Sequence, residues 1–231
     1  MKKLAMSALE VLIAMSLMIA ATVLGMNILH IYINKDTDVA KFKHAFASLS
    51  EVIYAIKNDS FMYTNTYYFA DLSPHNYLGE NITYGGEDKF KKLFTSKFNV
   101  LEKDVEVQFD KDVPLIKYTD KDGKEAYKTS KKITCFIENK GFMFCPPKTT
   151  FGEDEKLEAI YIPVYINKID NTSSSKGIDK AIFVEVGVKG KIEILPDIKS
   201  DSDTKVLDCT EKKYNDYNHC KVLDKMMDMD F

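Results

Sequence analysis

The start of the chain decides the fold: Met1-Lys2-Lys3-Leu4-Ala5-Met6-Ser7-Ala8-Leu9-Glu10 leads into a long apolar run. After Glu10 no charged residue occurs until Lys35. A helix needs about 20 apolar residues to cross the hydrocarbon core of a bilayer, and this run is long enough. The two lysines at its front are expected to stay in the cytoplasm. We therefore predict a single-pass transmembrane segment over residues 6–34, with the remaining chain outside the cytoplasm.

Glu10 constrains how this segment is interpreted, because an uncompensated charge at the edge of an apolar run is unfavourable. A cleaved secretory signal would end at a small-residue cleavage site, and Ala20 and Ala21 are small, but the apolar run continues past them. A simple membrane anchor accounts for length and orientation but leaves Glu10 without a role. The residue favours an interpretation in which an ionic partner meets its carboxylate.

The segment resembles the class III signal of type IV pilins and pseudopilins, which have a short basic leader and a glutamate at the fifth position of the mature chain. The resemblance implies that a prepilin peptidase removes residues 1–5 by cutting between Ala5 and Met6, and N-methylates Met6. It also implies that Glu10 neutralises the terminal amine of a neighbouring subunit, since buried charges are tolerable when paired. The family usually has glycine in place of Ala5 and phenylalanine in place of Met6.

The same resemblance implies a function in assembly. The chain would be a major or minor pilin or pseudopilin of a type IV pilus or a type II secretion-like filament, held in the inner membrane before assembly. Its partners would be other pilin-like subunits, the prepilin peptidase, an inner-membrane assembly platform and membrane lipid. The alternative is a monomeric membrane-anchored binding domain outside the cytoplasm.

Beyond residue 34 the pattern becomes amphipathic. Apolar residues recur at spacings of three and four, which is typical of one face of a helix: Val39, Phe42, Phe46, Leu49, Ile53 and Ile56. No proline or glycine occurs from Asn27 to Asn58. We predict one helix over residues 6–58, apolar all round at 6–34 and amphipathic at 35–58. At 1.5 Å per residue its length would be roughly 75–80 Å.

Residues 59–231 are predicted to form a globular head with an antiparallel sheet of four to six strands. Alternating or apolar segments bounded by turn residues indicate the strands: 105–109, 133–137, 142–145, 159–166, 181–186 and 191–195. A short helix is predicted near residues 87–98. The predicted fold class is α+β and pilin-like, with the long N-terminal helix packed on the sheet.

The four cysteines are Cys135, Cys145, Cys209 and Cys220. Their even number, and the lack of Cys/His spacing typical of zinc sites, favour two disulfides in an oxidising compartment over metal binding. A hairpin loop at residues 139–141 would place Cys135 opposite Cys145. The sequence alone leaves all three connectivities open, and buried free thiols are an alternative.

Composition argues against several functions. The net charge is -3, and acidic residues are interleaved with the lysines, so no basic surface for nucleic acid is predicted. No phosphate-binding loop, GxSxG or HExxH motif occurs, and we predict neither catalytic residues nor a metal or other cofactor. The loop with Asp170, Asn171 and Asp179 is a weak calcium candidate, since acidic loops are usually just solvated.

Overall fold

The computed structural model describes residues 37–63, 69–77, 81–150, 154–166, 177–200 and 204–227. The chain divides into two compact units, Met1–Lys41 and Phe42–Phe231. In the first unit the described residues are 37–41, and they are helical. The second unit holds the sheet, the other helices and both disulfides.

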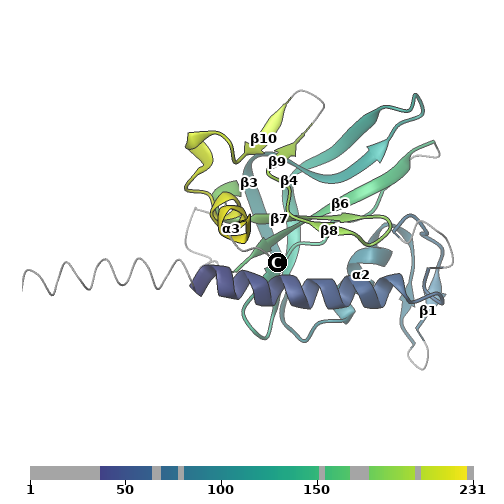
Figure 1. Ribbon diagram of the computed structural model, residues 1–231. Helices are drawn as coiled ribbons and strands as arrows, with labels where there is room; N and C mark the ends of the chain where they lie inside the picture. The colour runs from purple at the N-terminus through teal and green to yellow at the C-terminus, as the bar shows by residue number, and fades with distance from the viewer. Residues whose placement is uncertain are drawn as a thin grey trace, which may run out of the picture. The chain divides into compact units, whose positions relative to one another are not determined.

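A helix covers residues 37–57 (Figure 1). Within the second unit its buried side chains follow helical spacing: Phe42, Ala45, Leu49, Val52, Ile53 and Ile56. They belong to the same apolar core as the sheet. The helix ends where Asn58 donates both its backbone N–H and its side-chain amide to the Tyr54 carbonyl. The Asn58 side chain thus supplies a hydrogen-bond donor in the last turn, where the carbonyl groups lack partners within the helix.

The main sheet has six antiparallel strands in the order β3-β4-β5-β6-β7-β8. Their bounds are Val100–Thr119, Glu125–Glu138, Met143–Phe144, Lys156–Tyr165, Ile182–Gly187 and Ile192–Glu193. The end of β3 pairs with β4 on one side and with β6 on the other, so that β3 to β6 close into a ring. This closure places the inward side chains of the four strands in one core.

β3 stays paired over its length because irregularities absorb extra residues. Gln108 lies opposite Lys132, and Val113 lies opposite Ser130, so the intervening β3 segment bulges from the ladder. Bulges of this kind bend a strand and increase its twist, which assists closure of the ring. A second irregularity lies around Asp104, whose φ is 58°.

Aromatic rings fill the core between the sheet and α2 (Lys89–Ser96), which follows the 3-10 turn Gly86–Asp88. Phe94 lies within about 6.3 Å, between ring centroids, of four other phenylalanines. These are Phe90, Phe98, Phe136 and Phe144. Edge and tilted contacts between such rings add to the free energy gained by burial.

The remaining elements are short. Before α2, β1 (His75–Asn76) pairs with β2 (Thr83–Tyr84). After the main sheet, β9 (Asp197–Lys199) pairs with β10 (Lys205–Asp208), and α3 covers Asn218–Met227. Two further 3-10 turns lie at Ile178–Lys180 and Lys212–Tyr214.

The predicted fold class is wrong. Strands account for 39% of the described residues and helices for 28%, and the helices are short. Of the predicted long helix over residues 6–58, the structure describes a helix at 37–57, while residues 1–36 lie outside the described residues. The prediction treated the head as a simple sheet under a long helix and did not foresee the closed ring or the length of β3 and β4.

The predicted membrane location also needs correction. In the part of the chain that the structure describes, no helix is both long and apolar enough to cross a bilayer. The helix at 37–57 carries Lys43, Glu51 and Lys57, which a spanning helix would not tolerate without partners. The predicted transmembrane segment, residues 6–34, lies outside the described residues. The prediction of a single-pass membrane protein is therefore not supported.

Candidate functional site

The residues predicted for processing and assembly, Ala5, Met6 and Glu10, lie outside the described residues. The calcium candidates Asp170 and Asn171 do too, while Asp179 lies in the described 3-10 turn.

The cysteines form two disulfides in the structure. Cys135 is bonded to Cys145, and Cys209 is bonded to Cys220. The first joins β4 to the residue after β5 and is buried, and the second joins the end of β10 to α3. The two bonds are in separate parts of the head and form no common site.

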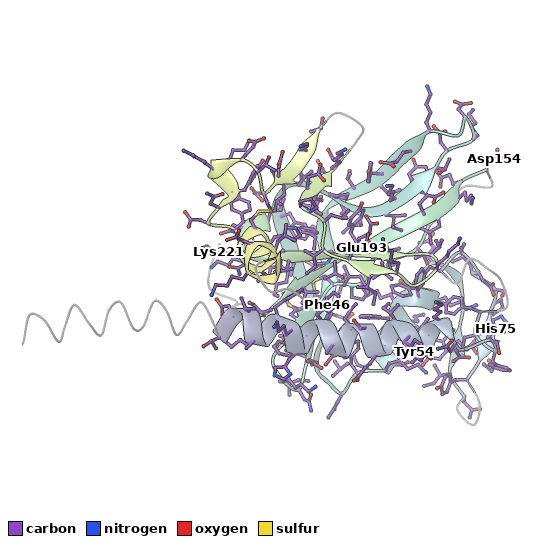
Figure 2. All side chains as sticks on the ribbon, in the orientation of Figure 1. Phe46, Tyr54, His75, Asp154, Glu193 and Lys221 are labelled. Carbon is purple, nitrogen blue, oxygen red and sulfur yellow. A yellow bond between two sulfur atoms is a disulfide. The ribbon has the colours of Figure 1, made fainter. Side chains whose placement is uncertain are left out.

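The outer face of the 37–57 helix is one candidate interaction surface. Tyr54 is 70% exposed there (Figure 2), and Ala47, Glu51 and Ala55 are exposed beside it. These residues recur at spacings of three and four and therefore lie on one face. The neighbours of Tyr54 one turn away, Glu51 and Asn58, are polar, and the small Ala47 and Ala55 are exposed on the same side of the helix. We refer to Ala47, Glu51, Tyr54 and Ala55 as the Tyr54 face.

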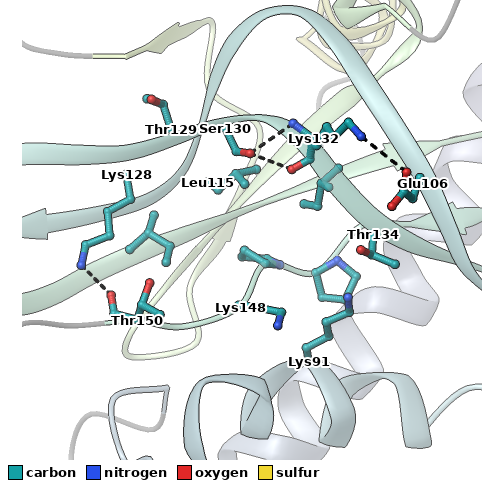
Figure 3. Close-up of a pocket in the computed structure, with 14 residues that line it drawn as sticks. Lys91, Glu106, Leu115, Lys128, Thr129, Ser130, Lys132, Thr134, Lys148 and Thr150 are labelled. Atoms are coloured by element: carbon teal, nitrogen blue, oxygen red, sulfur yellow. Dashed lines mark hydrogen bonds and ion pairs between the residues drawn. The ribbon is translucent and has the colours of Figure 1, made fainter.

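A second candidate is a groove of about 280 Å³ along β4 (Figure 3). One wall is the β4 segment from Lys128 to Thr134, and the other includes Pro146, Pro147 and Lys148. β5 pairs with β4 only at Phe136 and Ile137. The chain then continues into two prolines, which have no N–H to extend the ladder. The sequence thus opens a gap where a neighbouring strand would otherwise continue; we call it the β4 groove.

Lysines and hydroxyl groups line the β4 groove. Lys91 enters from α2, Lys148 from the proline segment, and Lys128 and Lys132 from β4 (Figure 3). The hydroxyl-bearing residues that line it are Thr129, Ser130, Thr134 and Thr150, and the carboxylate is that of Glu106. The lining therefore has an excess of positive charge, in a chain whose net charge is -3.

The lysines of the groove make ion pairs at its rim. Lys132 lies 3.7 Å from Glu106, and Lys148 lies 3.4 Å from Asp88. Both lysine side chains are more than half exposed, so each pair is worth at most about 1 kcal/mol. An incoming carboxylate can therefore compete for these lysines at small cost.

Burial is the main cause that lowers the pKa of Lys91. The carboxylates of Asp88 and Asp104 act in the opposite direction, and the positive charge of Lys148 adds to the lowering. A negatively charged ligand between these two lysines would remove their repulsion. The groove is thus electrostatically complementary to an anionic partner.

A larger hollow of about 690 Å³ continues from the groove and shares Lys91, Thr134 and Lys148 with it. Its apolar lining comes from β2 and the residue before it, from the segment between α2 and β3, from β3 and from β4. The residues are Ile82, Tyr84, Phe98, Val100 and Phe136. Lys92 and Lys103 also line this hollow. The combined surface is lysine-rich along β4 and has an apolar bed at its end.

Another lysine of α2 has a structural role. Lys89 is fully buried, with its Nζ 3.5 Å from Asp71 Oδ2 and 4.6 Å from the centre of the Tyr63 ring. Burial lowers the pKa of this lysine, while the Asp71 charge counteracts that effect. A buried ion pair with a cation–π contact holds α2 against Asp71 and Tyr63.

Sequence reasoning missed the β4 groove. Its lysines come from α2, β4 and the segment after β5, and their separation in sequence hides their proximity in space. The Pro146-Pro147 pair directly after the hairpin was the available signal, because two prolines cannot continue a paired strand.

Comparison of this chain with protein-family models, with curated proteins and with solved structures finds no match. Among the described residues, no group of three or more His, Cys, Asp or Glu side chains is arranged to hold a metal ion.

Proposed function

We propose that this chain is a structural subunit of a filament of the type IV pilin or pseudopilin class, and that its function is assembly with other subunits of that class. The observation that carries the proposal is the two-sided helix of the second unit. Its inner face is part of the head core, and its outer face leaves Tyr54 uncovered, with Ala47 and Ala55 exposed on the same side. Small residues on the same side as one aromatic side chain allow close packing of a second helix.

The N-terminal sequence supports the same proposal. Glu10 stands before an apolar run that ends at Lys35, and Lys2 and Lys3 precede the Ala5-Met6 step at which we predict cleavage. A neighbouring subunit would supply both an apolar surface for the run and an amine for the Glu10 carboxylate. A prepilin peptidase and an assembly platform are the partners that this processing would require.

Intact-mass measurement of the protein from its native cells, with fragmentation of the N-terminus, tests the proposal. We expect a chain that begins at Met6 and carries one added methyl group. A Glu10→Gln variant should be processed and accumulate normally but fail to enter filaments. An uncut chain that begins at Met1, or normal filaments from the Glu10→Gln variant, would contradict the proposal.

The β4 groove favours a second candidate, a monomeric binding domain. In that case Glu10→Gln would leave the function of the protein unchanged. Substitution of the groove lysines would abolish it. The two candidates thus make opposite predictions for the same pair of variants.

A further inference from the structure

The edge of β4 that faces away from β3 is unpaired over part of its length. Within the described ranges, no strand pairs with Thr129–Thr134 on the side away from β3. The Ser130 hydroxyl accepts a hydrogen bond from the Lys132 N–H at 3.1 Å and donates one to the Lys132 carbonyl at 2.7 Å. The main-chain groups of Lys132 are thus bound by a side chain of their own strand, which an added strand would have to displace there.

Unpaired strand edges can pair with the strands of other chains, so proteins usually cover or protect them. Lysines at an edge prevent pairing with most other strands, since a strand must bring charges that compensate them. The edge from Thr129 to Thr134 is about 20 Å long at ~3.3 Å per residue. It is therefore long enough to hold a short extended peptide through several main-chain hydrogen bonds.

We propose that the β4 groove binds an extended acidic peptide segment of a partner protein, which adds to the sheet as a strand along β4. Main-chain pairing with β4 supplies affinity, as in other cases of strand addition. The acidic side chains meet Lys91, Lys132 and Lys148, and an apolar side chain occupies the bed near Phe98 and Phe136. This inference does not depend on the proposed filament function.

The charge pattern identifies the partner's chemistry. A basic or neutral strand would place no counter-charge on the lysines, whereas alternate acidic residues would put their carboxylates on one face of the added strand. The apolar residues between them would then point to the other face, toward the floor that includes Leu115 and Ile133. A segment in which acidic and apolar residues alternate therefore matches both the lysines and the apolar floor of the groove.

The probe is a fluorescent seven-residue peptide, Glu-Val-Glu-Phe-Glu-Val-Glu, titrated into the full chain and followed by anisotropy. We expect saturable binding that Lys132→Glu and Lys148→Glu each weaken at least tenfold. Lys131→Glu is the matched control, because Lys131 lies on the same strand, does not line the groove and pairs with Asp112. It should change the affinity less than twofold. Equal weakening by all three substitutions would show unspecific charge attraction and overturn the proposal.

Two further probes separate strand addition from binding of any anion. Peptides N-methylated at odd or at even residues keep their charges but lose main-chain donors on one edge. We expect one of the two to lose at least tenfold in affinity and the other to change little. Equal affinity of both, or complete displacement of the peptide by sulfate at the same charge concentration, would refute strand addition. Lysine-dependent dimerisation of the chain without peptide binding would assign the groove to a second copy and also overturn the proposal.

Discussion

Two regions of the head are stabilised in different ways. The closed ring of β3 to β6 with α2 is held by continuous apolar contact, centred on Phe94 and the four phenylalanine rings around it. The C-terminal region, from β9 to α3, joins the same apolar core through Ile198, Leu207 and Val222 and is also held by a few directional bonds. These are the Cys209–Cys220 disulfide and two hydrogen bonds of His219, together with that from Lys111 Nζ to the Val206 carbonyl.

The difference predicts different sensitivities. Apolar burial is non-directional and depends weakly on pH or redox conditions. A disulfide opens under reduction, and a buried neutral histidine must be charged when the pH falls. The C-terminal region should therefore respond to acid, whereas reduction would open one disulfide in each region. Substitutions in the ring should instead act mainly through lost volume.

Phe94→Ala should have the largest effect. The side chain is fully buried, and truncation of a buried phenylalanine typically costs about 3–5 kcal/mol of stability. Denaturant unfolding at neutral pH would measure the loss. Leu101→Ala is the control, because Leu101 is 71% exposed and its truncation should change stability by no more than about 0.5 kcal/mol. Similar effects of the two substitutions would contradict the central place of Phe94 in the ring.

The two disulfides allow a direct test of the comparison, because their sequence separations are 10 and 11. Chain entropy alone predicts about 3 kcal/mol for each. The Cys135→Ala/Cys145→Ala double variant should lose more than the Cys209→Ala/Cys220→Ala variant, since Cys135 and Cys145 are almost fully buried and their truncation also leaves a cavity. Paired denaturant curves would measure the difference. A larger loss at the C-terminal pair would show that the ring tolerates truncation better than we infer.

Local patterns in the sequence were sufficient to locate most strands of the main sheet. The predicted segments 105–109, 133–137, 159–166 and 181–186 coincide with parts of β3, β4, β6 and β7. Each has alternating or continuous apolar residues that one or both faces of a sheet bury. The helical spacing in residues 42–56 likewise identifies the buried face, except that Phe46 is only partly buried.

Features that depend on distant residues could not be predicted in the same way. Asp110-Lys111-Asp112 and Pro114 suggest a break, but in the structure the bulge absorbs them and β3 continues to Thr119. β3 pairs with both β4 and β6 because the sheet curls, and no single segment of the sequence predicts this curvature. The β4 groove results from that same curvature and from Pro146-Pro147, so its lysines are brought together only by the fold.

Acid should destabilise the C-terminal region through His219. The ring is fully buried; its Nδ1 accepts a hydrogen bond from the Phe183 N–H at 3.1 Å, and its Nε2 lies 2.7 Å from the Leu195 carbonyl. Since a carbonyl only accepts, Nε2 carries the proton and the ring is neutral. Burial lowers the pKa of His219 from 6.5 to about 4.

The sign of the effect follows from this lowered pKa. The unfolded chain binds the proton first as the pH falls, so stability is complete above pH 6.5 and declines between pH 6.5 and pH 4. At about 1.4 kcal/mol per pH unit the loss amounts to roughly 3 kcal/mol. Unfolding curves at several pH values would measure it. A His219→Gln variant, which cannot titrate, should show a flatter profile; an equally steep profile would exclude His219 as the cause.

The smallest effect on stability is expected at Tyr54, although its effect on assembly should be large. The side chain is 70% exposed, so Tyr54→Ser should change the free energy of unfolding by no more than about 0.5 kcal/mol. If the Tyr54 face packs against a neighbouring subunit, the same substitution should reduce filament yield, measured by shearing and sedimentation from native cells. Leu101→Ser is the matched control, because it removes a side chain of the same exposure from β3, which is not part of the Tyr54 face. Loss of filaments with both variants would point to a general surface effect, and normal filaments with Tyr54→Ser would remove this face from the assembly interface.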